Sequence, residues 1–173
     1  MKISFLYANS TSGLKKLGGE IIKSVENTPF CHFAILFNDN FDEYIFEAVF
    51  PKTRKVKYSE WLKEYSVHTR FDFEIPSQDK RIECYEYLEL MINKWYGVDQ
   101  VLFIAFCIWF KLNEKFQLKT SINKNARLIC TEIGYLFSNR FFKYEYIPVN
   151  QDRIDLDDMV KIGCIINNKT EWK

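Results

Sequence analysis

A cysteine at the start of an amphipathic helix is the feature that most limits how this chain can fold. Residues 127–135 begin such a helix, because apolar side chains recur on one face. That face consists of Ile129, Ile133, Leu136 and Phe137, and Asn139 is a suitable end. At a helix start, unpaired backbone N–H groups and the positive end of the helix dipole favour an anion, so Cys130 gains thiolate character there. Cys130 is thus a candidate nucleophile; the alternative is a small buried apolar residue.

Composition restricts the chain to one domain and to few classes of partner. The chain has 173 residues and 47% hydrophobic content, which is enough for one buried core and too little for two. We therefore predict a single domain over residues 1–173. The 24 Lys and Arg residues against 23 Asp and Glu leave a net charge of +1, without a long run of one sign. We therefore expect neither nucleic acid nor an anionic membrane surface among the partners.

The cysteines indicate a reducing compartment. They stand at positions 31, 84, 107, 130 and 164, an odd set without a C-x-x-C pair, and the chain has only two histidines. This pattern argues against a disulfide framework and a structural zinc site, so no metal is expected. The apolar run at the N-terminus is shorter than the ~7 to 15 residues of a secretory signal. We therefore predict a cytoplasmic protein with reduced thiols.

The remaining pattern predicts an α+β fold with a small antiparallel sheet packed against helices. Strands are predicted at residues 3–8, 31–37, 44–50, 67–75, 141–148 and 160–166, and helices at 77–95 and 130–139. Residues 38–43 are rich in turn formers and join two strands into a hairpin. Residues 101–110 are apolar on every side but only about half as long as the ~20 residues that cross a bilayer, so we expect a buried helix and no membrane span.

Only two histidines are available as a base for Cys130. His32 lies in the first strand of the hairpin, whereas His68 begins a later strand with no carboxylate facing it. A two-residue turn at 39–40 would place Glu47 directly opposite His32, with Cβ atoms roughly 5 Å apart. The carboxylate could then accept the imidazole N–H and orient the ring. A loop longer by one residue would move Glu47 to the other face.

Four segments together resemble one known family. They are Cys-His-Phe-Ala-Ile-Leu-Phe around His32, Tyr-Ile-Phe-Glu-Ala-Val around Glu47, Trp-Tyr-Gly-Val-Asp at 95–99, and Leu-Ile-Cys-Thr-Glu-Ile around Cys130. Their order resembles the circularly permuted branch of the NlpC-type papain-like cysteine peptidases and amidases, in which the histidine strand precedes the cysteine helix. The resemblance covers about residues 1–165. It implies a permuted papain-like fold with the nucleophile at a helix N-terminus.

The resemblance also implies a role for each matched residue. Cys130 would be the nucleophile, His32 the base and Glu47 the polar residue that orients the base. Tyr96 and Asp99 would be structural. The implied reaction is cleavage of an amide bond, for instance in a cell-wall-type peptide, through a thioester and without a cofactor.

The chain departs from the family pattern at two places. Cys31 stands where a serine is expected before the histidine, and residues 101–125 look like an insertion, which bears on substrate access. Two other functional classes stay open. One is acyl transfer or lipid ester hydrolysis, with residues 101–110 lining an acyl pocket, and the other is a non-catalytic binding or structural protein.

Overall fold

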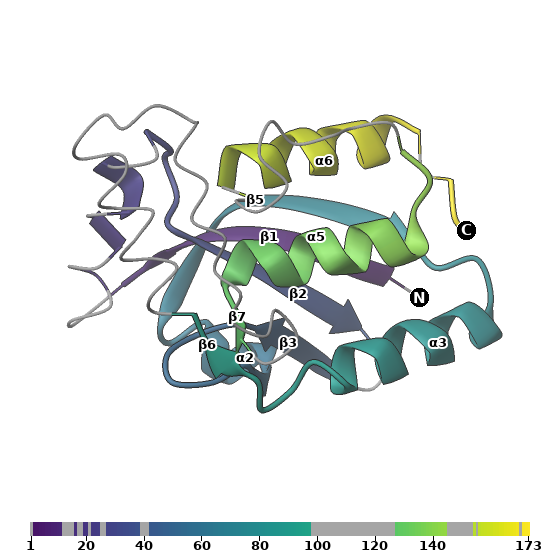
Figure 1. The fold of residues 1–173 in the computed structure, drawn as a ribbon, viewed down its shortest axis with the longest axis horizontal. Helices are drawn as coiled ribbons and strands as arrows, with labels where there is room; N and C mark the ends of the chain where they lie inside the picture. The colour runs from purple at the N-terminus through teal and green to yellow at the C-terminus, as the bar shows by residue number, and fades with distance from the viewer. Residues whose placement is uncertain are drawn as a thin grey trace.

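The computed structural model describes residues 2–11, 16, 19–20, 22–24, 27–38, 42–97, 127–144, 154, 156–169 and 171–173. Within these residues the fold is α+β, with a five-stranded antiparallel sheet and helices packed against it (Figure 1). The predicted class and the small antiparallel sheet are confirmed. The apolar helix expected at 101–110 and the insertion expected at 101–125 lie outside the described residues. No helix in the described part of the chain is long and apolar enough to cross a membrane.

The sheet has the strand order β4-β3-β2-β1-β5, and every neighbouring pair is antiparallel. The strands are β1 (Lys2–Ser10), β2 (His32–Asn38), β3 (Glu43–Glu47), β4 (Arg54–Lys57) and β5 (Tyr65–Glu74). Helices in the described ranges are α2 (Tyr58–Trp61), α3 (Gln78–Glu89), α5 (Cys130–Phe141) and α6 (Leu156–Asn168). A short parallel pair, β6 (Trp95–Tyr96) with β7 (Arg127–Leu128), leads directly into α5.

The two faces of the sheet bury different side chains, because successive residues of a strand point in opposite directions. One face is covered by α3, α5 and α6 (Figure 1), and its aromatic residues form the main core. Phe5 packs edge-on against Phe33 at 5.3 Å and against Phe73 at 4.9 Å between ring centroids. Such contacts contribute ~0.5–1.5 kcal/mol each beyond their buried area. The other face holds a smaller cluster that includes Trp61 and Tyr65.

Gly134 allows α5 to lie close to β2. A methyl group at Gly134 would come 2.5 Å from both Phe33 Cε1 and Met159 Cε, closer than such atoms can approach. A side chain here would therefore push α5 away from the sheet. Gly134 is one helical turn after Cys130, and Phe33 follows His32 in the sequence, so this contact sets how near Cys130 comes to His32.

Gly134→Ala is expected to destabilise the protein by about 1–3 kcal/mol, because the overlap outweighs the ~1 kcal/mol gained in helix propensity. The shift of α5 should also slow alkylation of Cys130. Urea unfolding and iodoacetamide labelling measure the two effects. Leu136→Ala, on the more exposed side of the same helix, is the control and should leave labelling unchanged. A Gly134→Ala protein as stable and as reactive as the parent would contradict the close packing.

The segment predicted as a strand at 160–166 is helical and belongs to α6. Its buried residues recur every three or four positions, which is the spacing of a helix face. They are Leu156, Asp158, Met159, Ile162, Gly163 and Ile166. Asp157 and Asp158 lie in the first turn, where the helix dipole favours acidic side chains. The prediction was wrong because it used only a short run rich in isoleucine and valine. The preceding apolar residues Leu156 and Met159 complete the helical spacing.

The helix predicted at 77–95 is shorter than expected. Ser77 caps α3 by accepting a hydrogen bond from the backbone N–H of Lys80, but the helix ends at Glu89. Asn93 has a left-handed backbone, with φ of 63°, which an α-helix does not accommodate. The chain then continues as β6, in which Trp95 pairs with Arg127 of β7.

The cysteine helix is longer than expected. It continues past Asn139 to Phe141, because the Phe141 side chain is fully buried in the main core at the same helical spacing as Phe137. The strand predicted at 141–148 is therefore wrong at its start. Phe142 forms only an isolated bridge with Trp172, and residues 145–148 lie outside the described residues.

Candidate active site

The sheet topology gathers polar side chains at one end. β2 begins with His32, β3 ends with Glu47, β4 begins with Arg54 and β5 begins with Tyr65. In an antiparallel sheet, the start of one strand lies beside the end of its neighbour, so these four residues share one end of the sheet. The register confirms this for Glu47 and Arg54, which are directly paired.

The hairpin places His32 and Glu47 on the same face, although not in the predicted register. Asn38 pairs with Glu43, so four residues separate the paired positions, whereas the prediction had a two-residue turn. The strand predicted to reach residue 50 also ends earlier, at Glu47. The register is shifted by two residues, and because side chains alternate with period two, a shift of two preserves the face. Glu47 is diagonal to His32, not directly opposite, and the shared face is confirmed by a 2.6 Å contact between His32 Nε2 and Glu47 Oε2.

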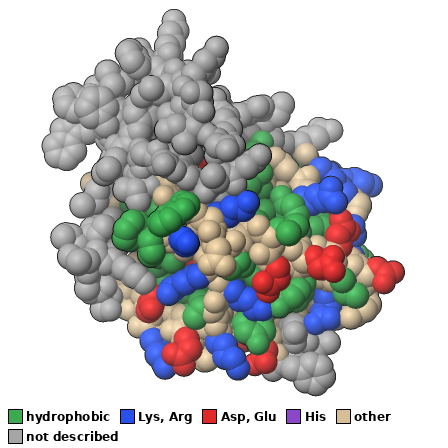
Figure 2. Space-filling view, turned by 60° about the horizontal axis from the view of Figure 1, so that its bottom comes forward, with side chains coloured by type: hydrophobic (Ala, Val, Ile, Leu, Met, Phe, Trp, Pro, Cys, Tyr) green, Lys and Arg blue, Asp and Glu red, His purple; other side chains and the backbone are tan. Residues whose placement is uncertain are grey.

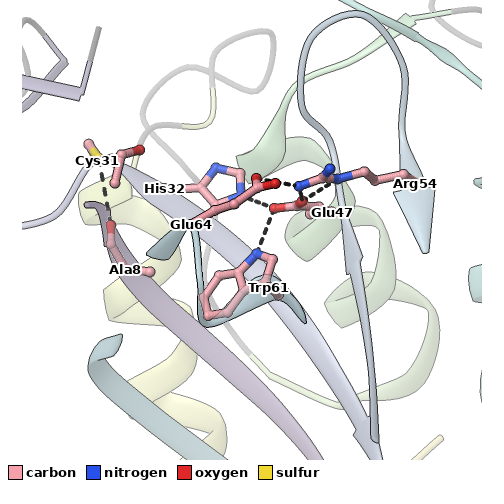
Figure 3. A network of polar contacts seen from close by, with 8 residues as sticks. Ala8, Cys31, His32, Glu47, Arg54, Trp61 and Glu64 are labelled. Atoms are coloured by element: carbon pink, nitrogen blue, oxygen red, sulfur yellow. Dashed lines mark hydrogen bonds and ion pairs between the residues drawn. The ribbon is translucent and has the colours of Figure 1, made fainter. Parts of the chain in front are cut away.

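Glu47 is the centre of a buried network (Figure 3). Its side chain is fully buried, and the carboxylate lies between His32 and Arg54. Oε2 accepts hydrogen bonds from His32 Nε2 at 2.6 Å and from Trp61 Nε1 at 2.9 Å, and Oε1 accepts from Arg54 Nε at 2.7 Å. Burial alone would raise the pKa of Glu47, but the hydrogen bond and charge of His32, with Arg54 and Trp61, lower it to about 2. The carboxylate is therefore ionised at neutral pH.

Two aromatic rings hold the imidazole of His32 in place. Tyr65 stacks on His32 with 4.8 Å between centroids and 18° between planes, and Trp61 stacks on Tyr65 at the same distance and angle. Since Trp61 also donates to Glu47, the contacts close a ring of four residues. This ring limits rotation of the imidazole. Neither Trp61 nor Tyr65 was predicted as a site residue.

α5 places Cys130 at its first position, as predicted. The helix begins at Cys130 after the N-cap Ile129, whose backbone N–H donates to Glu132 Oε2 at 3.0 Å. The next residue, Thr131, donates from Oγ1 to the carbonyl of Ile154 at 2.6 Å and so fixes the first turn. The first backbone N–H groups of a helix have no partner within the helix, and the N–H of Cys130 is one of them.

Cys130 lies close enough to His32 to influence the pKa of the imidazole. Burial alone would lower the pKa of His32, but hydrogen bonds with Cys130 and Glu47, together with their negative charges, raise it to about 10. Because Nε2 is bound to Glu47, Nδ1 is the ring nitrogen left for Cys130. The three residues predicted from the sequence therefore lie together in the order thiol, imidazole and carboxylate.

The other predicted residues lie away from this arrangement. The thiol of Cys31, where a serine was expected, points away from the His32 ring and toward the carbonyl of Ala8, 3.7 Å away (Figure 3). His68 is exposed, with Nδ1 2.9 Å from the hydroxyl of Thr69. Tyr96 pairs with Leu128, close before Cys130, and so helps to place α5. Asp99 lies outside the described residues.

Among the described residues, no group of three or more His, Cys, Asp or Glu side chains could hold a metal ion. The face in Figure 2 intersperses Lys and Arg with Asp and Glu, so this face offers no continuous basic surface. The described thiols of Cys31, Cys84, Cys130 and Cys164 are all free.

A thiol at a helix start, a buried imidazole and an ionised carboxylate lie together here, and these are the kinds of group that a site with a nucleophile, a base and an orienting group requires. Neither models of known protein families nor curated protein sequences match this chain.

Proposed function

We propose that this protein is a cysteine hydrolase that cleaves an amide bond in a peptide substrate through a thioester. The observation that supports this is the position of Cys130, which lies at the start of a helix and close enough to His32 to shift its pKa. Glu47 holds Nε2 of the His32 ring. A thiol becomes a strong nucleophile when a base and a helix N-terminus both favour its anion. Glu47 takes the orienting role.

The proposed reaction has two steps. In the first, the Cys130 thiolate attacks the carbonyl carbon, and the oxyanion accepts a hydrogen bond from the backbone N–H of Cys130. The His32 imidazolium gives its proton to the leaving amine, and the carbon–nitrogen bond breaks to leave a thioester. In the second, a water molecule gives a proton to His32 and attacks the thioester. The acid is released, and the proton on His32 restores the starting pair.

We assign the permuted papain-like fold as part of the same proposal. The histidine strand β2 and the glutamate strand β3 precede the cysteine helix α5 in the chain, which is the order of the permuted branch of the NlpC-type family. A shared fold does not fix the substrate, because function depends on the site. The alternative of acyl transfer or lipid ester hydrolysis involved residues 101–110, outside the described residues, and it stays a prediction.

Alkylation at low pH tests the proposal. A free thiol with a pKa of ~8.5 is below one per cent ionised at about pH 6. Cys130, beside an imidazolium, should react with iodoacetamide at least roughly tenfold faster than the exposed Cys164 at that pH. Peptide mapping by mass spectrometry measures each rate in the native protein. Equal or slower labelling at Cys130 would contradict its assignment as the nucleophile.

A further inference from the structure

Arg54 contacts the carboxylate of Glu47 on the oxygen remote from His32. Its Nε and Nη2 lie 2.7 and 2.6 Å from Oε1, while Nη2 also lies 2.9 Å from Glu64 Oε2. His32 and Trp61 take the other oxygen. The contacts form a line of alternating charges, in which the His32 imidazolium, Glu47, Arg54 and Glu64 follow one another.

The proton between His32 and Glu47 has two places to rest. On Nε2 it gives an ion pair, and on Oε2 it gives a neutral imidazole beside a carboxylic acid. Burial favours the neutral pair, because charges lose their hydration in the protein interior. Donors on the carboxylate favour the ion pair, and of these only Arg54 adds a full positive charge that is not itself part of the proton transfer.

No other described group around Glu47 can replace Arg54. The neighbouring elements supply His32 from β2, Trp61 from α2 and Tyr65 from β5, and Cys130 of α5 lies beyond the imidazole. The indole is neutral, and burial raises the pKa of the Tyr65 hydroxyl, so that neither brings a charge. Glu64, just before β5, is negative and bound to Arg54.

We propose that Arg54 is a positioning residue that keeps the shared proton on His32 and so maintains the imidazolium beside Cys130. This inference rests on the proposed function, because it concerns the same thiol and imidazole. Without the guanidinium, the balance between these two places shifts from His32 Nε2 toward Glu47 Oε2. The imidazolium is then less stable, and the thiolate has weaker support from that cation.

The test is the pH profile of iodoacetamide labelling at Cys130 in Arg54→Gln, Arg54→Lys and the parent protein. Arg54→Gln keeps a hydrogen-bond donor but removes the charge. Its labelling rate at about pH 6 should fall roughly tenfold or more, which corresponds to a change of about one pKa unit. At about pH 9 the rate should approach that of the parent, because the thiolate then forms without help. Arg54→Lys should recover most of the rate at low pH.

The matched control is Arg70→Gln. Arg70 is as exposed as Arg54, at 35% against 34%, and binds the carboxylate of Asp72 away from the site. Its labelling profile should equal that of the parent. If Arg54→Gln folds poorly, Arg54→Met is used in its place, with folding checked by circular dichroism.

The ¹⁵N chemical shifts of the His32 ring give a second readout. In Arg54→Gln the ring should lose its positive charge at a pH about one unit lower than in the parent. If labelling is fast in the parent and the pH profile is unchanged in Arg54→Gln, the role of Arg54 is overturned but the proposed function is not. A rate that falls equally at every pH, with the titration of the His32 ring unchanged, also overturns it. Slow labelling of Cys130 in the parent overturns the proposed function itself.

Discussion

Cys130→Ala is expected to abolish hydrolysis while leaving the protein folded. The change removes the attacking atom, and losses of roughly 10⁴-fold or more in turnover are typical when the nucleophile of such a site is removed. Cys130 is only partly buried at the first position of α5, so stability should change by about 1 kcal/mol or less. Release of p-nitroaniline from peptide anilides and of p-nitrophenol from acyl esters measures turnover. The preferred probe also separates amidase from acyl chemistry.

His32→Ala should lower turnover nearly as far as Cys130→Ala, and the double variant should be no worse than either single one. Residues that act as a unit give such non-additive losses. Cys164→Ala is the control, because Cys164 is an exposed, free thiol remote from β2 in sequence and on a different helix. It should retain full activity. Turnover that survives in Cys130→Ala would mean that the arrangement of Cys130, His32 and Glu47 is not catalytic.

The three residues at the centre of the site could be predicted because their placement depends on local rules. A helix start is recognisable from apolar spacing, which located Cys130 on α5. A strand pairing fixes which face a side chain occupies, and an error of two residues in the register leaves the face unchanged. For this reason Glu47 was correctly placed beside His32, although the loop between β2 and β3 is longer than predicted.

The supporting residues could not be predicted in the same way. Arg54 reaches Glu47 across the β3–β4 pair, whose register depends on the conformation of residues 48–53. Trp61 and Tyr65 meet His32 only because β5 pairs with β1 and brings the start of β5 to the same end of the sheet. These contacts combine several long-range pairings, and a single sequence provides no local signal for them. The prediction of a strand at 160–166 was wrong for a related reason. For a short apolar run, contacts with the rest of the protein decide between helix and strand.

Removing the carboxylate of Glu47 should have the largest effect on stability. Glu47→Ala leaves buried His32, and the part of Arg54 that contacts it, without a counter-charge, and breaking such a buried pair costs about 3–5 kcal/mol. Glu47→Gln should cost less, because the amide oxygen still accepts a hydrogen bond. Urea unfolding at about pH 6 measures both values. Glu43→Gln, on the same strand and only half-buried, is the control and should change stability by about 0.5 kcal/mol or less.

The stabilisation by the buried pair of His32 and Glu47 should depend on pH in a defined direction. The pKa of Glu47 is lowered from 4.5 to about 2, so its contribution is complete above pH 4.5 and is lost as the pH falls toward 2. The pKa of His32 is raised from 6.5 to about 10, so its contribution is complete below pH 6.5 and is lost as the pH rises toward 10. The pair should therefore stabilise the fold most between pH 4.5 and 6.5. In Glu47→Ala, the fall in stability from about pH 6.5 to 9 should become shallower, because His32 loses the carboxylate that raises its pKa. If the parent and Glu47→Ala lose stability equally over that range, the buried pair of His32 and Glu47 does not exist in solution.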